Sequence, residues 1–333
     1  MTFEAGKLSA IQLAITSSAL EGDAAAIYHM ISDLLGEGMP FDAILLEVLS
    51  PVQNGLGERW RSGDYLISEE HAATSAIETV VALLAGSLEQ PEDAKRVVIA
   101  CVEGDDHSLP GRFLNALLLY RGFRTTYLGG TMPADDLEKF LLEDPPDAVA
   151  LTCAMTTHLP GALASIAAAH NVALPVIVGG DAFGEDGSRA ARLGADDWAP
   201  DLLAAVDALE TWEVGKLPTG DPVAPSSEYL ALIAARPAIT AAASSQVAGS
   251  PEQSARHHDE VELLFDVLLA AMVCDEDAII DEYVGWFISG GDDRSSSDAS
   301  AALLIEALQD AVGDEHPEAA LRLSRAEASL AGS

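Results

Sequence analysis

Residues 97–111 read Val-Val-Ile-Ala-Cys-Val-Glu-Gly-Asp-Asp-His-Ser-Leu-Pro-Gly. The first six residues are apolar and suit a buried strand, and a helical pattern follows the polar loop. Apolar runs and helical patterns keep alternating as far as residue 199, which predicts a doubly wound, parallel sheet of five strands. We expect strands at 97–102, 125–128, 148–153, 175–178 and 196–199, with helices between them at 111–121, 133–143, 160–171 and 185–193.

The α/β segment, 95–213, lies between two segments that contain only helical patterns. Residues 1–90 predict four antiparallel helices with short loops, the last two near 42–60 and 66–88, which is typical of a four-helix bundle. Residues 214–226 are rich in Pro and Gly and predict a linker. Residues 227–333 predict more helices, near 228–240, 258–273, 275–288, 298–312 and 316–330, interrupted by loose stretches at 241–256 and 289–299.

The charge of the chain excludes several classes of partner. It has 54 acidic and 17 basic residues, and its formal net charge of −37 would be repelled by a duplex or an anionic membrane surface. No Lys/Arg run or zinc-finger spacing offsets this charge, so we expect no direct nucleic-acid binding. No apolar run reaches the roughly 18 residues of a membrane span, so we expect no membrane insertion.

The cysteines and the N-terminus indicate the compartment. Cys101, Cys153 and Cys274 are widely spaced, and the first two lie in predicted strands, which is typical of reduced, buried thiols. The N-terminus lacks the basic region and apolar stretch of a signal peptide. We therefore expect a cytoplasmic protein.

The loop after the first strand carries the main candidate for metal binding. A doubly wound sheet binds its ligands beyond the carboxyl ends of its strands, which is where this loop lies. The neutral imidazole of His107 is a good donor to cobalt, and Asp105 can accept the other ring N–H and fix the tautomer. Taken alone, an Asp-x-His pair is also typical of an ordinary surface histidine.

The loop resembles the Asp-x-His-x-x-Gly signature of cobalamin-binding domains, whose sheet is flavodoxin-like. The resemblance implies that His107 binds cobalt from below, and that the benzimidazole of cobalamin swings into a slot beside the sheet. The family glycine is Pro110 here, a departure that affects how the loop enters the next helix. Further loop residues expected at the site are Ser108, Leu109 and Gly111.

Other parts of the signature follow in order. Thr152 ends the third strand, where the family has a small hydroxyl residue. Gly129 and Gly130 end the second strand, and Gly179 and Gly180 end the fourth. Glycines there would let the benzimidazole tail pass close to the backbone, although each is also typical of a tight turn after a strand.

A second motif lies in the helical segment that precedes the sheet. Trp60 is followed, after nine residues, by Glu70 and His71. This spacing resembles the Trp-x9-Glu-His motif of cobalamin-dependent photoreceptors that repress carotenoid genes. The resemblance implies a helical cap whose Trp, Glu and His lie over the upper corrin face. Without it, Trp60 would simply anchor two helices and Glu70-His71 would lie on a solvated face.

The C-terminal segment resembles globin-like or phycobilin-type sensor domains in its Tyr-x-x-Trp pattern at Tyr283 and Trp286. Such a domain joined to a cobalamin module is similar to the photocobilins, which sense light with cobalamin and biliverdin. We expect Tyr283 and Trp286 to form pocket walls, although both residue types are usually core. Cationic groups expected near propionates or pyrroles are Arg256, His257, His258 and Arg294. Cys274 is more typical of a buried helix cysteine than of a bilin attachment site.

These resemblances predict a light sensor that binds adenosyl- or methylcobalamin and, in its C-terminal domain, biliverdin. The photoreceptor repressors begin with a winged-helix DNA-binding domain, whereas this chain begins directly with the cap, so we expect a protein partner or effector and a homodimer. We expect no enzyme, because no nucleophile-base pair is evident. A corrinoid methyl-carrier protein is the alternative, and an antirepressor acting through a protein partner is a third reading.

Overall fold

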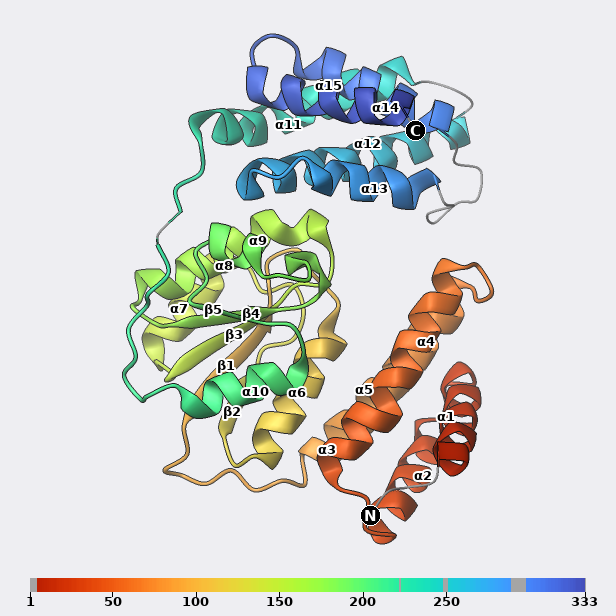
Figure 1. Cartoon of the computed structure of the whole chain (residues 1–333), viewed down its shortest axis with the longest axis vertical. Coiled ribbons are helices and arrows are strands. Elements are labelled where there is room, and N and C mark those ends of the chain that lie inside the picture. The colour runs from red at the N-terminus through yellow and green to blue at the C-terminus, as the bar shows by residue number, and fades with distance from the viewer. Residues whose placement is uncertain (1–4, 222, 248–250, 289–297, 333) are drawn as a thin grey trace.

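The computed structural model describes residues 5–221, 223–247, 251–288 and 298–332. Figure 1 shows three groups of elements along the chain: an N-terminal group of helices, an α/β group around one sheet, and a C-terminal group of helices. The fold class predicted for the first two groups is confirmed. The globin-like character of the third stays a prediction.

The N-terminal helices, called the cap below, are α1 (Ala5–Leu20), α2 (Ala24–Gly36), a continuous segment from Phe41 to Arg61, and α5 (Ile67–Ala85). The continuous segment consists of α3 (Phe41–Ala43), a π-helical turn η1 (Ile44–Leu49) and α4 (Ser50–Arg61). Pro51 lacks an N–H and would clash with the carbonyl one turn earlier, which explains the wider turn that precedes it.

The sheet has the strand order β2-β1-β3-β4-β5, with every neighbouring pair parallel. Its strands are β1 (Arg96–Cys101), β2 (Arg124–Tyr127), β3 (Ala148–Thr152), β4 (Val176–Gly179) and β5 (Asp197–Ala199). The α-helices between and after them are α6 (Ser108–Tyr120), α7 (Ala134–Glu143), α8 (Leu159–Asn171), α9 (Ser188–Arg192) and α10 (Leu202–Thr211). Short 3-10 turns, η2 (Thr156–His158) and η3 (Asp181–Phe183), precede α8 and α9.

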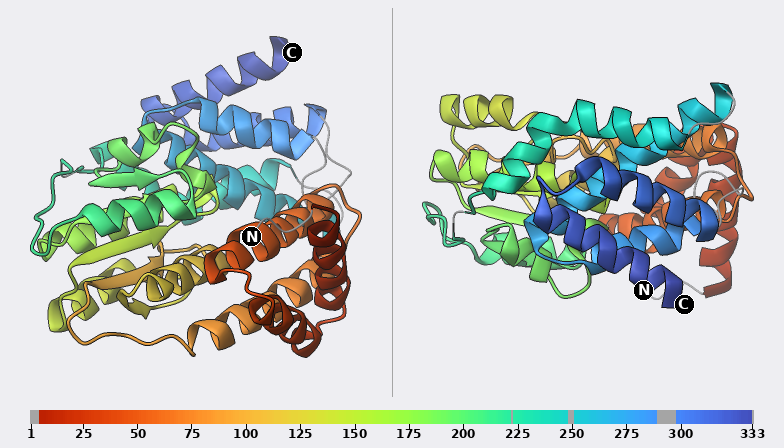
Figure 2. Two further views of the ribbon diagram at one scale, coloured as in Figure 1. Left: turned by 60° about the horizontal axis from the view of Figure 1, so that its bottom comes forward. Right: turned by 90° about the horizontal axis from the view of Figure 1, so that it is seen from above.

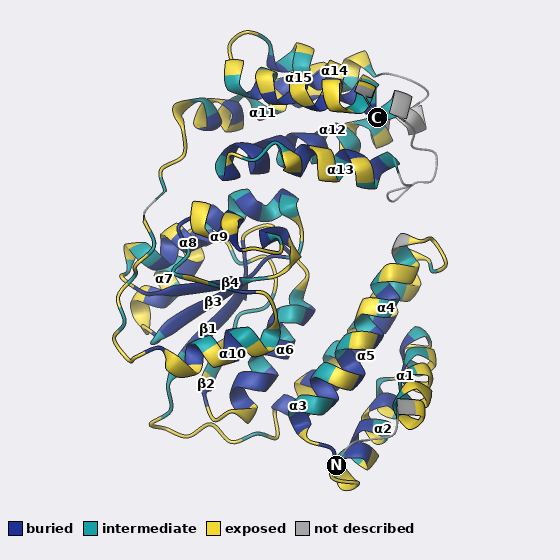
Figure 3. Cartoon of the chain, viewed as in Figure 1, coloured by how far each residue is buried: buried dark blue, intermediate teal, exposed yellow. Residues whose placement is uncertain are grey.

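Each face of the sheet belongs to a different apolar core. Val97 and Ile99 of β1 pack with α6, α10 and the cap, whereas Val98 and Ala100 pack with α7, α8 and the C-terminal helices. Side chains alternate between the faces of a strand, so a strand that is apolar throughout serves both cores. Figure 3 shows the resulting dark, buried sheet between more exposed helices.

The C-terminal helices are α11 (Ser227–Gln246), α12 (Pro251–Cys274), α13 (Ala278–Ile288), α14 (Asp298–Val312) and α15 (Pro317–Gly332). Among them, α12 contacts α8, α9 and η2, so this group rests on the side of the sheet away from α6 (Figures 1 and 2). The predicted loose stretch 241–256 is wrong in part, because α11 runs on to Gln246 and α12 begins at Pro251. The stretch 241–246 is Ala- and Ser-rich and lacks large apolar residues, but alanine has the highest helix propensity.

The predicted linker is tied to the α/β group at Asp196. The Asp196 carboxylate accepts hydrogen bonds from the backbone N–H groups of Thr219 and Gly220, the latter at 2.8 Å. Its other oxygen accepts from Val176 N at 2.6 Å and contacts His170 Nε2 at 2.9 Å. In the described part of the chain, no helix has the length and apolarity that a membrane crossing requires.

Candidate functional site

Strand register brings three loops together at the carboxyl edge of the sheet. Cys101 pairs with Thr152, and Thr152 pairs with Gly179, so the loops that follow β1, β3 and β4 are neighbours. The sequence predicted candidate residues at each of these three positions. The structure therefore places them at one edge, where doubly wound folds bind their ligands.

His107 stands directly before α6, at the N-cap position. Its Nδ1 atom lies 2.6 Å from Asp105 Oδ1, and its side chain is 46% exposed. Because Nδ1 is hydrogen bonded, Nε2 is the ring nitrogen available to a metal. The hydrogen bond with Asp105 raises the pKa of His107 more than burial lowers it, and the charges of Asp106 and Glu70 act in the same direction as Asp105.

Asp105 is a buried carboxylate, with 1% of its side chain exposed. Its Oδ1 also accepts from the backbone N–H of His107 at 3.0 Å, and its Oδ2 accepts from that of Ala154 at 2.5 Å. Burial alone would raise its pKa, but the hydrogen bonds from His107 and the backbone, together with the nearby imidazole of His158, lower it well below its usual range. A carboxylate that stays ionised here fixes the tautomer of His107.

His158 is a site residue that the sequence analysis missed. It ends η2, after β3, and its Nδ1 lies 3.6 Å from Asp105 Oδ1. Potential ligand atoms of Asp105, His107 and His158 all lie within 4.8 Å of one another. The 2.6 Å distance between Asp105 and His107 is that of a hydrogen bond, not of two ligands around a metal ion. Asp105 therefore lies between two imidazoles, and the three residues are not a preformed metal chelate.

The substitution of the family glycine by Pro110 does not disturb the loop. Pro110 occupies the third position of α6, where its missing N–H has no intrahelical partner in any case. Ser108 donates its hydroxyl to Glu78 of α5 and so joins the loop to the cap. Leu109 is buried in the apolar core on the cap side.

Thr152 and Gly111 lie beside each other beneath the loop. The Thr152 hydroxyl donates to Cys101 Sγ at 3.4 Å, so its bond is to the neighbouring strand. A Cβ at Gly111 would come within 2.9 Å of the Tyr127 ring and 3.5 Å of Thr152 Oγ1. Glycine is therefore required by the close packing of α6 on the sheet.

The glycines at the strand ends differ in what a Cβ atom would contact at each position. A Cβ at Gly180 would lie 2.2 Å from the Cys153 carbonyl oxygen, and φ there is +113°. A Cβ at Gly130 would lie 3.2 Å from Asp106 Cα, and one at Gly179 would lie 3.2 Å from the Ala199 carbonyl oxygen. Gly129 has φ of +84° and open space around it. Backbone packing thus accounts for three of them, and a benzimidazole slot stays a prediction.

The cap residues lie at one end of the α4–α5 pair. Trp60 is half-buried near the end of α4, whereas Glu70 and His71 lie in the first turns of α5. Glu70 Oε1 accepts from the Thr74 hydroxyl at 2.5 Å and from Gln53 Nε2 at 3.3 Å. The charge of Glu70 also acts to raise the pKa of His107, less than Asp105 does.

The C-terminal candidates lie on two helices. Arg256 and His258 are exposed near the start of α12, where His258 Nδ1 lies 3.1 Å from Ser244 Oγ, and His257 is half-buried. On α13, the Tyr283 and Trp286 rings have centroids 5.8 Å apart. Arg294 lies outside the described residues. These contacts leave the biliverdin site a prediction.

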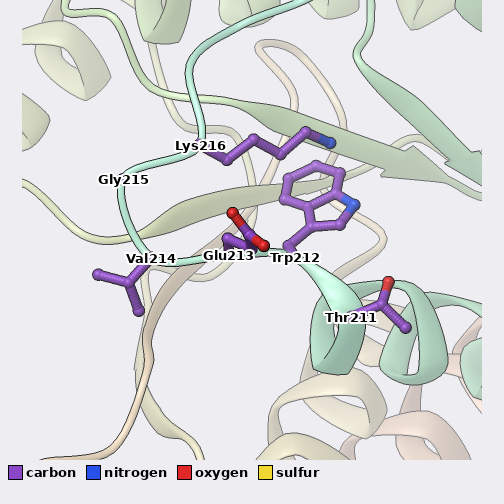
Figure 4. Close-up of a pocket in the computed structure, with 6 residues that line it drawn as sticks. All are labelled: Thr211, Trp212, Glu213, Val214, Gly215 and Lys216. Atoms are coloured by element: carbon purple, nitrogen blue, oxygen red, sulfur yellow. The ribbon is translucent and has the colours of Figure 1, made fainter.

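A surface pocket of about 430 Å³ lies elsewhere, between Thr211 and Lys216 (Figure 4). It follows α10, and Lys95, which precedes β1, donates to the Leu209 carbonyl at 2.6 Å. The pocket is therefore at the amino ends of the strands, opposite His107. Lys216 Nζ lies over the Trp212 ring there, 3.4 Å from its centroid. We assign no ligand to it.

The donor set at the carboxyl edge fits a cobalt ion in a corrin. It offers one outward-facing imidazole whose second nitrogen is held by a buried, ionised carboxylate. The cap also has an unsatisfied buried polar atom, Gln53 Oε1, beside Glu70.

Comparisons with known proteins agree with this fit. Residues 95–207 match the sequence family described as "B12 binding domain", and residues 11–85 match a second family with the same description. The HTH-type transcriptional repressor CarH of Myxococcus xanthus is 32% identical over 184 residues, which are 50% of this chain and 60% of the relative. The chain thus spans less than two thirds of that relative's length.

Among solved structures, the monomethylamine corrinoid protein of Methanosarcina barkeri is similar with a TM-score of 0.51 and 18% identity. The match covers 60% of this chain and 96% of that protein. At this identity the likeness shows a shared fold alone. Together, the two matched families support cobalamin binding by the cap and the sheet.

Proposed function

We propose that this chain, two segments of which match B12-binding families, is a cobalamin-dependent light sensor. The observation that carries cobalamin binding is the Asp105–His107 pair at the carboxyl edge of the sheet. The observation that favours light sensing is the Trp60 and Glu70-His71 set at one end of the cap, together with the 32% identity to the CarH repressor.

In this proposal each residue has a defined task. His107 would hold the cobalt through Nε2, while Asp105 holds the proton on Nδ1. When adenosyl- or methylcobalamin is bound, it supplies a cobalt–carbon bond that visible light breaks. Trp60, Glu70 and His71 would contact the alkyl ligand of the intact cofactor, so loss of that ligand would remove those contacts.

The cap responds because those contacts differ between the two states. A conformational equilibrium shifts only by the difference in interaction free energy that a ligand makes with each state. The Ser108–Glu78 hydrogen bond and the 3.9 Å Arg112–Glu78 ion pair join the cap to α6. A change in the cap would therefore reach residues 102–107, called the cobalt loop below. The proposed output is a change in a homodimer or in a protein partner.

The alternative is a corrinoid methyl-carrier protein, which would use His107 in the same way. It requires no response of the cap to light. The cap residues therefore discriminate between the two functions, whereas the lower ligand does not.

The test compares hydrogen exchange of residues 50–85 before and after illumination. Protein loaded in the dark with adenosylcobalamin should show a light-induced change in these residues and in oligomeric state. Protein loaded with cyanocobalamin, which has no alkyl ligand, should show none. The same exchange pattern for both cobalamins, together with methyl transfer to a thiol from protein loaded with methylcobalamin, would establish the carrier function instead.

Biliverdin binding in the C-terminal helices is a separate part of the proposal. Its support is the aromatic pair Tyr283 and Trp286 beside a helix that begins with Arg256 and two histidines. Protein co-produced with a biliverdin source should yield that pigment on extraction, identified by mass spectrometry. Extraction of cobalamin alone would restrict the sensor to one chromophore.

A further inference from the structure

The guanidinium of Arg189 joins two parts of the chain that lie far apart in the sequence. Arg189 belongs to α9 of the α/β group, and 6% of its side chain is exposed. Its Nη2 atom lies 2.7 Å from Glu276, in the turn between α12 and α13, and 2.7 Å from Glu282 of α13. An arginine is rarely this buried unless it is paired, so these two carboxylates hold the side chain in one position. Arg189, Glu276 and Glu282 are called the Arg189 cluster below.

The same guanidinium also binds the loop that follows β4. Arg189 Nη1 donates to the Ala182 carbonyl at 3.2 Å. The Ala182 N–H donates in turn to the Cys153 carbonyl at 3.3 Å. Two residues earlier, a Cβ at Gly180 would lie 2.2 Å from that carbonyl oxygen. Residues 179–182 are therefore held between the end of β3 on one side and Arg189 on the other.

The turn between α12 and α13 is itself held from a second direction. Arg322 of α15, with 7% of its side chain exposed, contacts Asp275 at 2.7 Å and Glu318 at 3.1 Å. Asp275 has φ of +48°, a conformation that costs a residue other than glycine free energy and that these contacts maintain. Arg189 thus binds a turn whose position the C-terminal helices already fix.

In the proposed cobalamin site, Gly179 and Gly180 lie beside the benzimidazole tail. We infer that the C-terminal helices complete this part of the site: through the Arg189 cluster, they keep residues 179–182 in the conformation that receives the tail. The inference rests on the proposed binding of cobalamin and does not depend on the response to light. Because coupling between two sites is reciprocal, binding of the tail should also stabilise α12 and α13.

The decisive variant changes the C-terminal side of the cluster alone. Glu276→Ala/Glu282→Ala removes both carboxylates and leaves every residue of the α/β group as it is. The matched control is Asp259→Ala/Asp281→Ala, which removes one exposed carboxylate from α12 and one from α13. The two double variants have the same net charge, so a difference between them reports the Arg189 cluster.

The measurements are made in the dark with two corrinoids. Aquocobalamin carries the benzimidazole tail, whereas diaquocobinamide has the same corrin without it. We measure both dissociation constants by absorbance titration, and hydrogen exchange in peptides within 275–288 with and without each corrinoid. In wild type, aquocobalamin should slow this exchange more than diaquocobinamide does.

The glutamate variant should bind aquocobalamin about fivefold more weakly than wild type, or weaker still, and should lose the slowing of exchange. Its affinity for diaquocobinamide should stay within about twofold of wild type, because that corrinoid makes no use of residues 179–182. The aspartate control should match wild type with both corrinoids.

Each other outcome overturns the inference. Wild-type affinity for aquocobalamin in the glutamate variant would show that the loop needs no support from the C-terminal helices. An equal loss for both corrinoids would exclude an effect on the tail, and an equal loss in the aspartate control would show a general effect of charge. If the double variant does not fold, Glu282→Ala and Asp281→Ala are compared in the same way, because Glu282 is half exposed.

Failure of the proposed function has a different signature. A wild-type protein that binds neither corrinoid would overturn cobalamin binding and this inference together. A wild-type protein that does not respond to light, but in which the glutamate variant loses affinity for aquocobalamin alone, would end only the sensor function.

Discussion

At the scale of single residues, the site depends on which nitrogen of His107 carries the proton. Asp105 is ionised and buried, so it accepts from Nδ1 and leaves Nε2 with a lone pair. An amide in the same place could donate to Nδ1 instead, which would move the ring proton to Nε2. In the proposed cobalamin site, the tautomer of His107 decides whether Nε2 is free to hold cobalt.

Asp105→Asn is therefore expected to lower the affinity for aquocobalamin by about 10- to 100-fold, as measured by absorbance titration. Asp106→Asn is the matched control, because Asp106 lies 3.6 Å from the same ring nitrogen but its side chain is 85% exposed. Equal affinities for the two variants would contradict the assignment of the tautomer to Asp105.

His158 shows why part of the site could not be predicted. The Asp105–His107 pair is adjacent in sequence and follows an apolar run, so its position at a strand end is evident. His158 lies in a short turn after another strand, with no spacing that relates it to the loop. Only the register of β1 with β3 brings the two segments together, and register depends on tertiary packing.

At the scale of elements, the sequence predicts the sheet well, because apolar runs bounded by polar loops are strong indicators of buried strands. All five strands lie within one or two residues of their predicted limits. The end of α11 was missed, because residues 241–246 have helix propensity without apolar periodicity. The contact of the linker with the α/β group was also missed, because the Asp196 carboxylate that accepts its backbone hydrogen bonds is more than 20 residues away in the sequence.

The close approach of α8 to the cobalt loop predicts a strong effect of one methyl group. Gly161→Ala places a Cβ 1.9 Å from the Glu103 carbonyl oxygen, so the loop or the helix must move. We expect a loss of about 1–3 kcal/mol in the free energy of unfolding, measured with urea. Gly55→Ala in α4, where a Cβ meets nothing within 4 Å, should be neutral or stabilising. A Gly161→Ala protein as stable as wild type would contradict this packing.

The hydrogen bonds of Asp196 predict how the free energy of unfolding depends on pH under acidic conditions. Burial would raise the pKa of this carboxyl, but hydrogen bonds from His170 and from the backbone of Thr219, Val176 and Gly220 lower it well below its usual range. A lowered pKa contributes stability that is complete above the ordinary value of about 4 and is lost as pH falls toward the folded-state pKa. The unfolding free energy of Asp196→Asn should therefore fall less steeply below about pH 4 than that of wild type. Asp197→Asn, an exposed neighbour, should follow wild type.

At the scale of the whole molecule, the C-terminal helices are joined to the sheet through Arg189. Its guanidinium is buried, and it contacts Glu276 and Glu282 at 2.7 Å and donates to the Ala182 carbonyl. Arg192, on the same helix, forms only an exposed ion pair with Asp275. The two arginines of α9 therefore differ in how much of their interaction is shielded from solvent.

Arg189→Met should lower the free energy of unfolding by about 1–2 kcal/mol and increase hydrogen exchange in α12 and α13. Arg192→Met should change the free energy of unfolding by no more than about 0.5 kcal/mol, because exposed ion pairs contribute little. The comparison is read from peptides within 251–288. Equal exchange in both variants would mean that apolar packing alone holds the C-terminal helices.

The alternation of side chains in β1 has a practical consequence. Positions 97 and 99 belong to the core shared with the cap, and positions 98 and 100 to the core shared with the C-terminal helices. Trimming a methyl group at Ile99 or at Val98 would thus loosen one half of the protein while the backbone between them stays the same. Substitutions at these two adjacent residues of one strand would therefore perturb the cap side and the C-terminal side of the protein separately.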